Sequence, residues 1–138
     1  MGETGTIAGP VHPADAQDQK ILTIVCTADS EDATFADTEI GNTQLKKLQG
    51  YKLSYVFVSP GATGPTDDSD LTIKKNGVDI LGGNGANIVD NAVDGYCVPK
   101  GTNSDSPFPV LVDHPLTVGI ANNAVNSAVV TITMVFER

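Results

Sequence analysis

The chain of 138 residues is poor in aromatic rings and in positive charge. It contains no Trp, three Tyr, four Phe and a single Arg. With so few rings, the core of a folded domain must be built mainly from Val, Ile and Leu. The formal net charge is −9, and the Lys residues are scattered along the chain. Proteins that bind phosphate groups need a basic patch, so we expect no direct nucleic-acid binding and no anionic membrane partner.

Cysteine and long apolar segments are also scarce. Cys26 and Cys97 are the only cysteines, too few for a disulfide framework, and we predict that both thiols are free. The apolar run over residues 21–26 is far too short to span a bilayer. No basic segment followed by an apolar run is present near residue 1, so we predict no signal peptide. We therefore expect a soluble protein that is made inside a cell.

The usual signatures of metal and nucleophile sites are missing. His12 and His114 lie in separate Pro-flanked segments, and the chain has no HExxH or GxSxG motif. Counted from Asp67, the acidic run 67–70 lacks the Gly and the Glu that an EF-hand needs at its sixth and twelfth positions. Asp residues that cap turns explain this run better, and a looser carboxylate site is the less favoured alternative.

The glycine-rich segment 82–87 (GGNGAN) does not match a phosphate-binding loop. No Gly-Lys-Ser/Thr follows it, and Ile88 occupies the place of the third Gly in a dinucleotide fingerprint. Glycines here are better explained by positive φ angles in a tight turn. The pair of carboxylates in a glycosidase leaves no motif, but a chain without Trp offers no aromatic-rich cleft. We predict a non-enzymatic protein with no catalytic residue, no cofactor and no metal.

What the chain does have is alternation between apolar and polar residues. Residues 20–28 (KILTIVCTA) predict a strand with Leu22, Ile24 and Cys26 on one face. Residues 128–137 (AVVTITMVFE) predict a second long strand, and we expect the two strands to pair or to lie close together because both lie near the chain ends.

The segment 51–59 (YKLSYVFVS) predicts a central strand of a packed sheet. Strict alternation would place one set of side chains on a shared face, with Val56 and Val58 on the opposite face. The first set is Tyr51, Leu53, Tyr55 and Phe57.

Turn residues separate the remaining segments, since the chain has 14 Gly and 8 Pro. Asn76-Gly77 favours a type I′ turn and predicts a hairpin between residues 71–73 and 78–81. Further short strands are predicted at residues 108–112 and 116–121. About seven or eight strands without a long helix indicate an all-β fold, an antiparallel β-sandwich of jelly-roll-like form.

The first 19 residues read differently from the rest. Several Gly and Pro residues interrupt any regular period there, so we predict an extended N-terminal arm over residues 1–19 and one β-sandwich domain over residues 20–138. The arm would be held by its own domain or by a neighbouring subunit. The candidate interface residues are Ile7, Pro10, Val11, His12 and Pro13.

Several turn-and-strand patterns resemble the small virion structural proteins of tailed bacteriophages. The first half contributes Gly50-Tyr51-Lys52-Leu53, Ser59-Pro60-Gly61, PTDDSDLTI over residues 65–73 and GVDILGG over residues 77–83. The second half contributes residues 115–136, in which Pro115-Leu116 precedes a strand and Asn122-Asn123 follows it. The resemblance lies in turns and alternation and includes no chemical motif.

That resemblance implies a virion protein that decorates and stabilises the outer surface of the phage head, called a capsid decoration or cement protein. The implied partners are the major capsid protein and copies of the chain itself in a symmetric oligomer. We expect a homotrimer, because the three-fold positions of a capsid lattice and closed symmetry favour it. The protein would be made in the host cytoplasm and end on the outer head surface. A tail, neck or head-fibre component is one alternative. A carbohydrate-binding adhesive β-sandwich is another, and it would need exposed aromatic rings, which Tyr residues in strand patterns do not favour.

Overall fold

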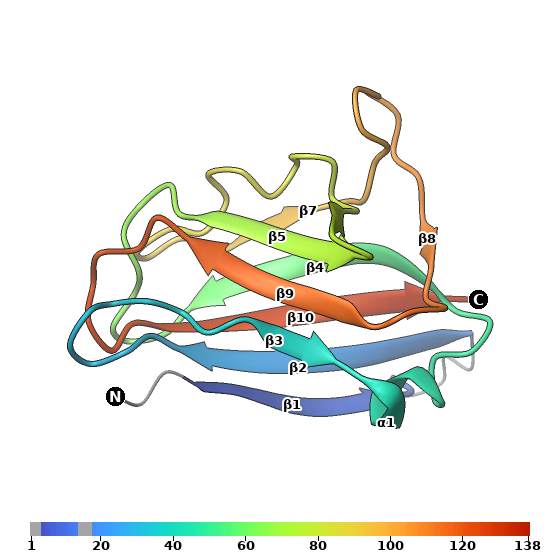
Figure 1. Cartoon of the computed structure of the whole chain (residues 1–138), viewed down its shortest axis with the longest axis horizontal. Helices are drawn as coiled ribbons and strands as arrows, with labels where there is room; N and C mark the ends of the chain where they lie inside the picture. Colours follow the sequence, from blue (N-terminus) through green and yellow to red (C-terminus); the bar gives the residue numbers. More distant parts are fainter. Residues whose placement is uncertain (1–3, 14–17) are drawn as a thin grey trace.

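The computed structural model describes residues 4–13 and 18–138. It confirms an all-β fold in which two antiparallel sheets pack face to face (Figure 1). The jelly-roll-like form that we expect from the sequence stays a prediction. Within the described residues, no helix has the length or the apolar character needed to cross a membrane.

The larger sheet, called sheet A here, has β10 at its centre. Its path runs β1-β2-β10-β4-β7, and a sixth strand, β8, pairs with the start of β4. The predicted neighbourhood of the two long terminal strands is confirmed, because β10 pairs with β2 along the whole of both strands. The strands are β1 (Thr4–Val11), β2 (Gln19–Thr27), β4 (Lys52–Pro60), β7 (Gly95–Cys97), β8 (Val110–Leu111) and β10 (Val129–Glu137).

The smaller sheet, sheet B, has the order β3-β9-β5-β6 and lies in front of sheet A in Figure 1. The predicted hairpin is confirmed between β5 and β6, where Asn76 and Gly77 have φ angles of 52° and 80°, as a type I′ turn requires. The elements are β3 (Thr38–Ile40), β5 (Asp70–Lys75), β6 (Val78–Asp79), β9 (Leu116–Ala121) and the single-turn helix α1 (Asn42–Leu45).

The core fills the space between the two sheets. Alternate residues of β2 and β10 are fully buried, as the period of two predicts. Leu71 and Ile73 of β5 face them from sheet B, together with Val118 and Ile120 of β9. The alternating buried residues of the two long strands are Leu22, Ile24, Cys26, Val130, Ile132, Met134 and Phe136, and Val135 on the other side of β10 is buried as well.

Strand β4 departs from the predicted alternation. Its register against β10 shifts by one residue, because Val135 is opposite Tyr55 while Phe136 is opposite Leu53. This is a β-bulge, in which the extra residue turns the following side chains to the other face. Leu53, Val56 and Val58 are therefore buried, and the prediction that Tyr55 and Phe57 share a face with Leu53 is wrong.

The first described residues form an edge strand of the sandwich. β1 pairs with β2, and Ile7 packs against the core, so this part of the predicted arm is held by its own domain. Gly5 lies so close to β3 that a Cβ atom would overlap Oγ1 of Thr38. The proposed domain boundary at residue 19 stays a prediction.

We predict that Gly5→Ala lowers the free energy of unfolding by about 1–3 kcal/mol, the usual cost of an extra methyl group in a packed contact. The measurement is chemical denaturation. Gly41→Ala is the matched control, since a Cβ there would lie 3.5 Å from its nearest atom, Oε1 of Glu39. Equal stability of the two variants would show that β1 does not pack against β3.

Candidate interaction surfaces

The residues that most resemble catalytic or metal-binding groups lie apart in the structure. Nδ1 of His12 is 2.9 Å from the carbonyl oxygen of Gln19, and Nδ1 of His114 is 2.9 Å from the carboxylate of Asp113. No group of three or more His, Cys, Asp or Glu side chains within residues 4–13 and 18–138 is placed to hold a metal ion.

The two thiols are buried and free, as predicted. Cys26 belongs to β2 and Cys97 to β7, and β10 and β4 lie between these strands. Burial raises the pKa of Cys26 to about 11, against a smaller lowering by its hydrogen bond with Thr38. Burial also raises the pKa of Cys97 to about 11, and the negative charge of Asp79 adds to this rise. Both groups are therefore core residues and poor nucleophiles.

The hollow beside α1 has a volume of about 280 Å³ and is lined mostly by polar side chains. Asp113 on its rim forms an ion pair with Lys75. Hydrogen bonds from Lys75 and His114 lower the pKa of Asp113 to about 2. The Asp113 carboxylate is thus ionised and already bound to Lys75 and His114.

One end of the sandwich collects four loops that are distant in the sequence. Asn123 joins three of them, because its Oδ1 accepts a hydrogen bond from the Thr66 amide at 3.0 Å and its Nδ2 donates to the Ala33 carbonyl at 2.8 Å. The backbone N–H of Asn91 donates a hydrogen bond to the Asp67 carboxylate at 2.8 Å and attaches the fourth loop. We call this the acidic end; it comprises residues 28–37, 61–70, 86–94 and 122–128.

The carboxylates of the acidic end hold these loops together. Asp70 accepts a hydrogen bond from the backbone N–H of Asn87 at 2.8 Å and another from the side chain of Asn122. Asp90 accepts one from the Asp68 amide at 3.2 Å. The acidic run 67–70 therefore stabilises turns and loops through hydrogen bonds, in agreement with the interpretation that these Asp residues cap turns.

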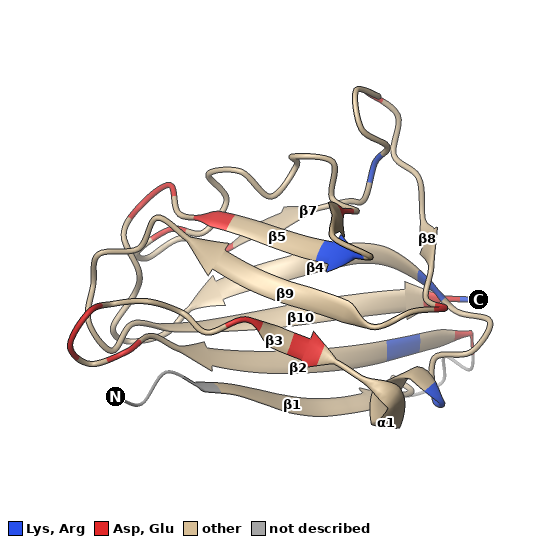
Figure 2. Cartoon of the chain, viewed as in Figure 1, with Lys and Arg blue, Asp and Glu red and all other residues tan. Residues whose placement is uncertain are grey.

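The acidic end also carries the whole net charge of the chain. It contains nine Asp and Glu residues and no Lys or Arg. The other eight acidic residues equal in number the eight Lys and Arg of the chain. Figure 2 shows these acidic loops at the left, while the basic residues lie toward the other end. The molecule is thus electrically polar along its strands.

The solvent-facing side of sheet A, which we call the outer face, has the opposite character. Its side chains form rows across the strands, such as Thr23, Thr133, Phe57 and Tyr96, with no charged residue among them. Lys20, Lys52 and Glu137 are the only charged residues of the strands of sheet A, and they lie at the end away from the acidic loops. The face comprises Thr6, Ala8, Ile21, Thr23, Val25, Thr27, Tyr55, Phe57, Ser59, Tyr96, Val129, Thr131, Thr133 and Val135, of which Val135 is buried.

Three aromatic rings gather on this outer face, and the bulge in β4 turns two of them, Tyr55 and Phe57, to this side. The ring centroids of Tyr55 and Phe57 are 5.5 Å apart, and those of Phe57 and Tyr96 are also 5.5 Å apart. Phe57 is 46% exposed and Tyr96 is 67% exposed. The expectation that strand positions would hide the Tyr rings is thus wrong for Tyr96.

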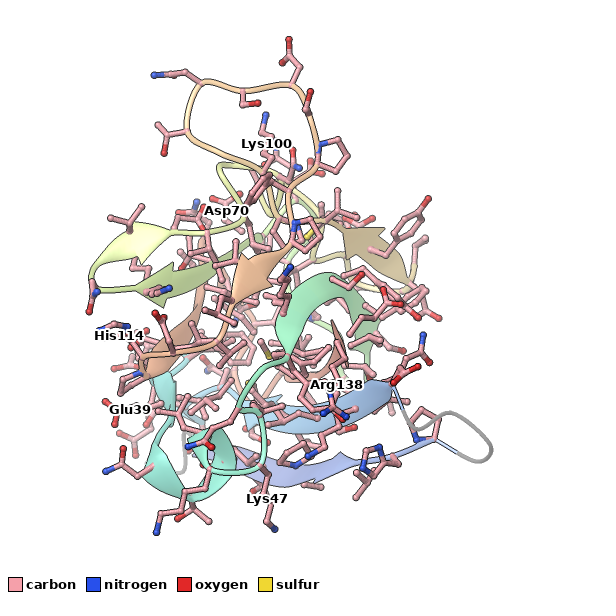
Figure 3. All side chains as sticks on the ribbon, turned by 90° about the vertical axis from the view of Figure 1, so that its right-hand side faces the viewer. Glu39, Lys47, Asp70, Lys100, His114 and Arg138 are labelled. Atoms are coloured by element: carbon pink, nitrogen blue, oxygen red, sulfur yellow. The ribbon has the colours of Figure 1, made fainter. Side chains whose placement is uncertain are left out.

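A second apolar surface lies beside β6 and β8, which belong to different sheets but contribute residues to the same hollow. Val78, Phe108 and Leu111 are 56%, 69% and 44% exposed, and we call them the β6–β8 patch. A hollow of about 170 Å³ adjoins the patch and is lined in part by Ile80 and Val110. The loop 100–107 projects beyond it at the top of Figures 1 and 3, with Lys100 at its base.

The sequence-predicted interface residues are only partly available to a partner. Pro10 is buried and Ile7 and Pro13 are half-buried, whereas Val11 and His12 are exposed. The sequence did not predict the outer face or the β6–β8 patch. The only sequence signal for Phe108 was its place between two prolines, and the bulge that exposes Phe57 has no sequence signal.

Comparison with known proteins adds no relative. Searches against protein-family models, curated proteins and solved structures each return no match.

We predict that neither thiol of the native protein reacts rapidly with a thiol reagent at pH 8. With a pKa of about 11, the thiolate fraction is on the order of 0.1%. In guanidinium chloride both should react at the rate of a free thiol. Ser106→Cys, in an exposed loop, supplies the positive control. Fast labelling of a wild-type thiol in the native state would contradict this account of the core.

Proposed function

We propose that the chain is a non-enzymatic virion structural protein that binds the outer surface of a phage head and stabilises it. The resemblance of residues 50–83 and 115–136 to phage virion proteins supports the class. The observation that carries the role is the division of the surface, with the net charge at one end and the β6–β8 patch at the other.

The positions of the strand ends define this division. Val78 pairs with Lys75 at the end of β5, whose first residue, Asp70, belongs to the acidic end. Leu111 pairs with Lys52 at the start of β4, which runs toward the same acidic loops. The patch and the acidic end therefore lie at opposite ends of the sandwich.

In the proposed arrangement the β6–β8 patch docks on the major capsid protein and the acidic end points to solvent. Exposed apolar side chains around a hollow are typical of protein-binding sites. An acidic outer end keeps the decorated particles apart and soluble. The homotrimer expected from lattice symmetry stays a prediction, and the two-copy pairing proposed below is the alternative to it.

We predict that Val78→Asp reduces binding to expanded heads at least tenfold, because a carboxylate in the contact loses its hydration without a partner. Co-sedimentation with heads that lack the protein measures this. Val93→Asp is the matched control, since Val93 is 63% exposed but lies in the acidic end.

Equal binding by Val78→Asp and wild type would remove the β6–β8 patch from the contact. Failure of the wild-type chain to bind heads would overturn the proposed function. Binding to tails or necks instead would favour the alternative position in the virion.

A second candidate function, carbohydrate binding, is favoured by the exposed rings of Phe57 and Tyr96. Sugar rings stack on aromatic faces, and Ser59 and Asp94, 2.8 Å apart, offer hydrogen-bonding groups near β7. If this candidate is correct, a glycan array will show binding by the wild-type chain that Tyr96→Ala abolishes. An array without binding would eliminate it.

A further inference from the structure

We propose that two copies of this chain pair through the outer face of sheet A, with the strands of the two copies running in opposite directions. The pairing goes beyond the capsid role and does not depend on it. Its first support is that the rows at the centre of the face carry no charge, while Lys52 and Glu137 lie in the last row at one end and Asp94 borders the other end. Burying a charged side chain without a partner is costly, and the centre of this face requires no such burial.

The size of the face fits a stable pair. The five strands have eight, nine, nine, nine and three residues, and at about 3.3 Å per residue and about 4.8 Å between strands they give roughly 600 Å² per copy. Two such faces bury about 1,200 Å² in total, at the lower limit of specific interfaces. The rings of Phe57 and Tyr96 supply aromatic side chains of the kind that dominate binding energy.

A self-complementary face implies a two-fold axis. An axis parallel to the strands would place the two acidic ends against each other. An axis across the strands instead reverses the direction of each strand over its own counterpart, with β10 over β10. The acidic end of each copy then lies near the end of its partner that bears Lys52, Glu137 and Arg138, which keeps the two acidic ends apart.

In this arrangement the start of β4 in one copy lies over the end of β4 in the other. Lys52 therefore approaches Asp94 of the second copy, because Asp94 is hydrogen-bonded to Ser59 near the end of β4. Lys52 and Asp94 are both exposed in the single chain.

Sedimentation equilibrium of the full chain tests the pairing. We expect a species of twice the 14.3 kDa chain mass at micromolar concentrations. Thr133→Lys, at the centre of the outer face, should weaken association at least tenfold. Thr117→Lys is the matched control, because Thr117 holds the equivalent outward position on β9, the central partner of β3 and β5 in sheet B.

Circular dichroism establishes that the variants are folded, and Thr131→Lys, next along β10, replaces Thr133→Lys if that variant is not. A monomer at every concentration overturns the proposal and leaves the rings to another ligand such as a saccharide. A trimer, or equal weakening by Thr117→Lys, overturns it too.

Zero-length carbodiimide cross-linking tests the direction of the strands. A link between Lys52 of one copy and Asp94 of the other is the expected product, and links between the ends that both bear Lys52 would overturn the antiparallel arrangement. Head binding is measured separately. If the chain pairs but does not bind heads, the capsid role fails and the pairing stands; the opposite result reverses that conclusion.

Discussion

The β-bulge in β4 determines which side chains the outer face of sheet A exposes. One extra residue opposite Val135 keeps Leu53 in the core yet turns Tyr55 and Phe57 outward. Without it, strict alternation would bury the rings that now lie on the outer face and expose Val56 and Val58. β4 lies beside the central strand β10, so the bulge places aromatic rings near the middle of the outer face. The core on the other side of sheet A remains continuous.

The net charge and the exposed apolar side chains of this chain lie in different places. The carboxylates of the acidic end accept hydrogen bonds that join its loops, so the residues that carry the net charge also order the turns there. The outer face and the β6–β8 patch are left free of that charge. These three surfaces of different character fit the role we propose, with one surface for a second copy, one for the capsid and one for solvent.

Much of the fold follows from local patterns in the sequence. The period of two predicts β2 and β10, and Asn76-Gly77 predicts the hairpin of β5 and β6, since each depends on neighbouring residues alone. The bulge escapes prediction because a one-residue shift of register leaves no compositional trace. The candidate surfaces escape it because they depend on contacts between loops far apart in the sequence, such as that of Asn123 with Ala33.

A reconstruction of heads with the chain bound tests the central claim most directly, because it shows the site, the orientation and the neighbours at once. The account predicts density on the outer surface, with the β6–β8 patch against the major capsid protein, the acidic end toward solvent and the outer face of sheet A against a second copy. Density confined to the tail or to the inside of the head, or an acidic end pressed against the shell, would contradict it.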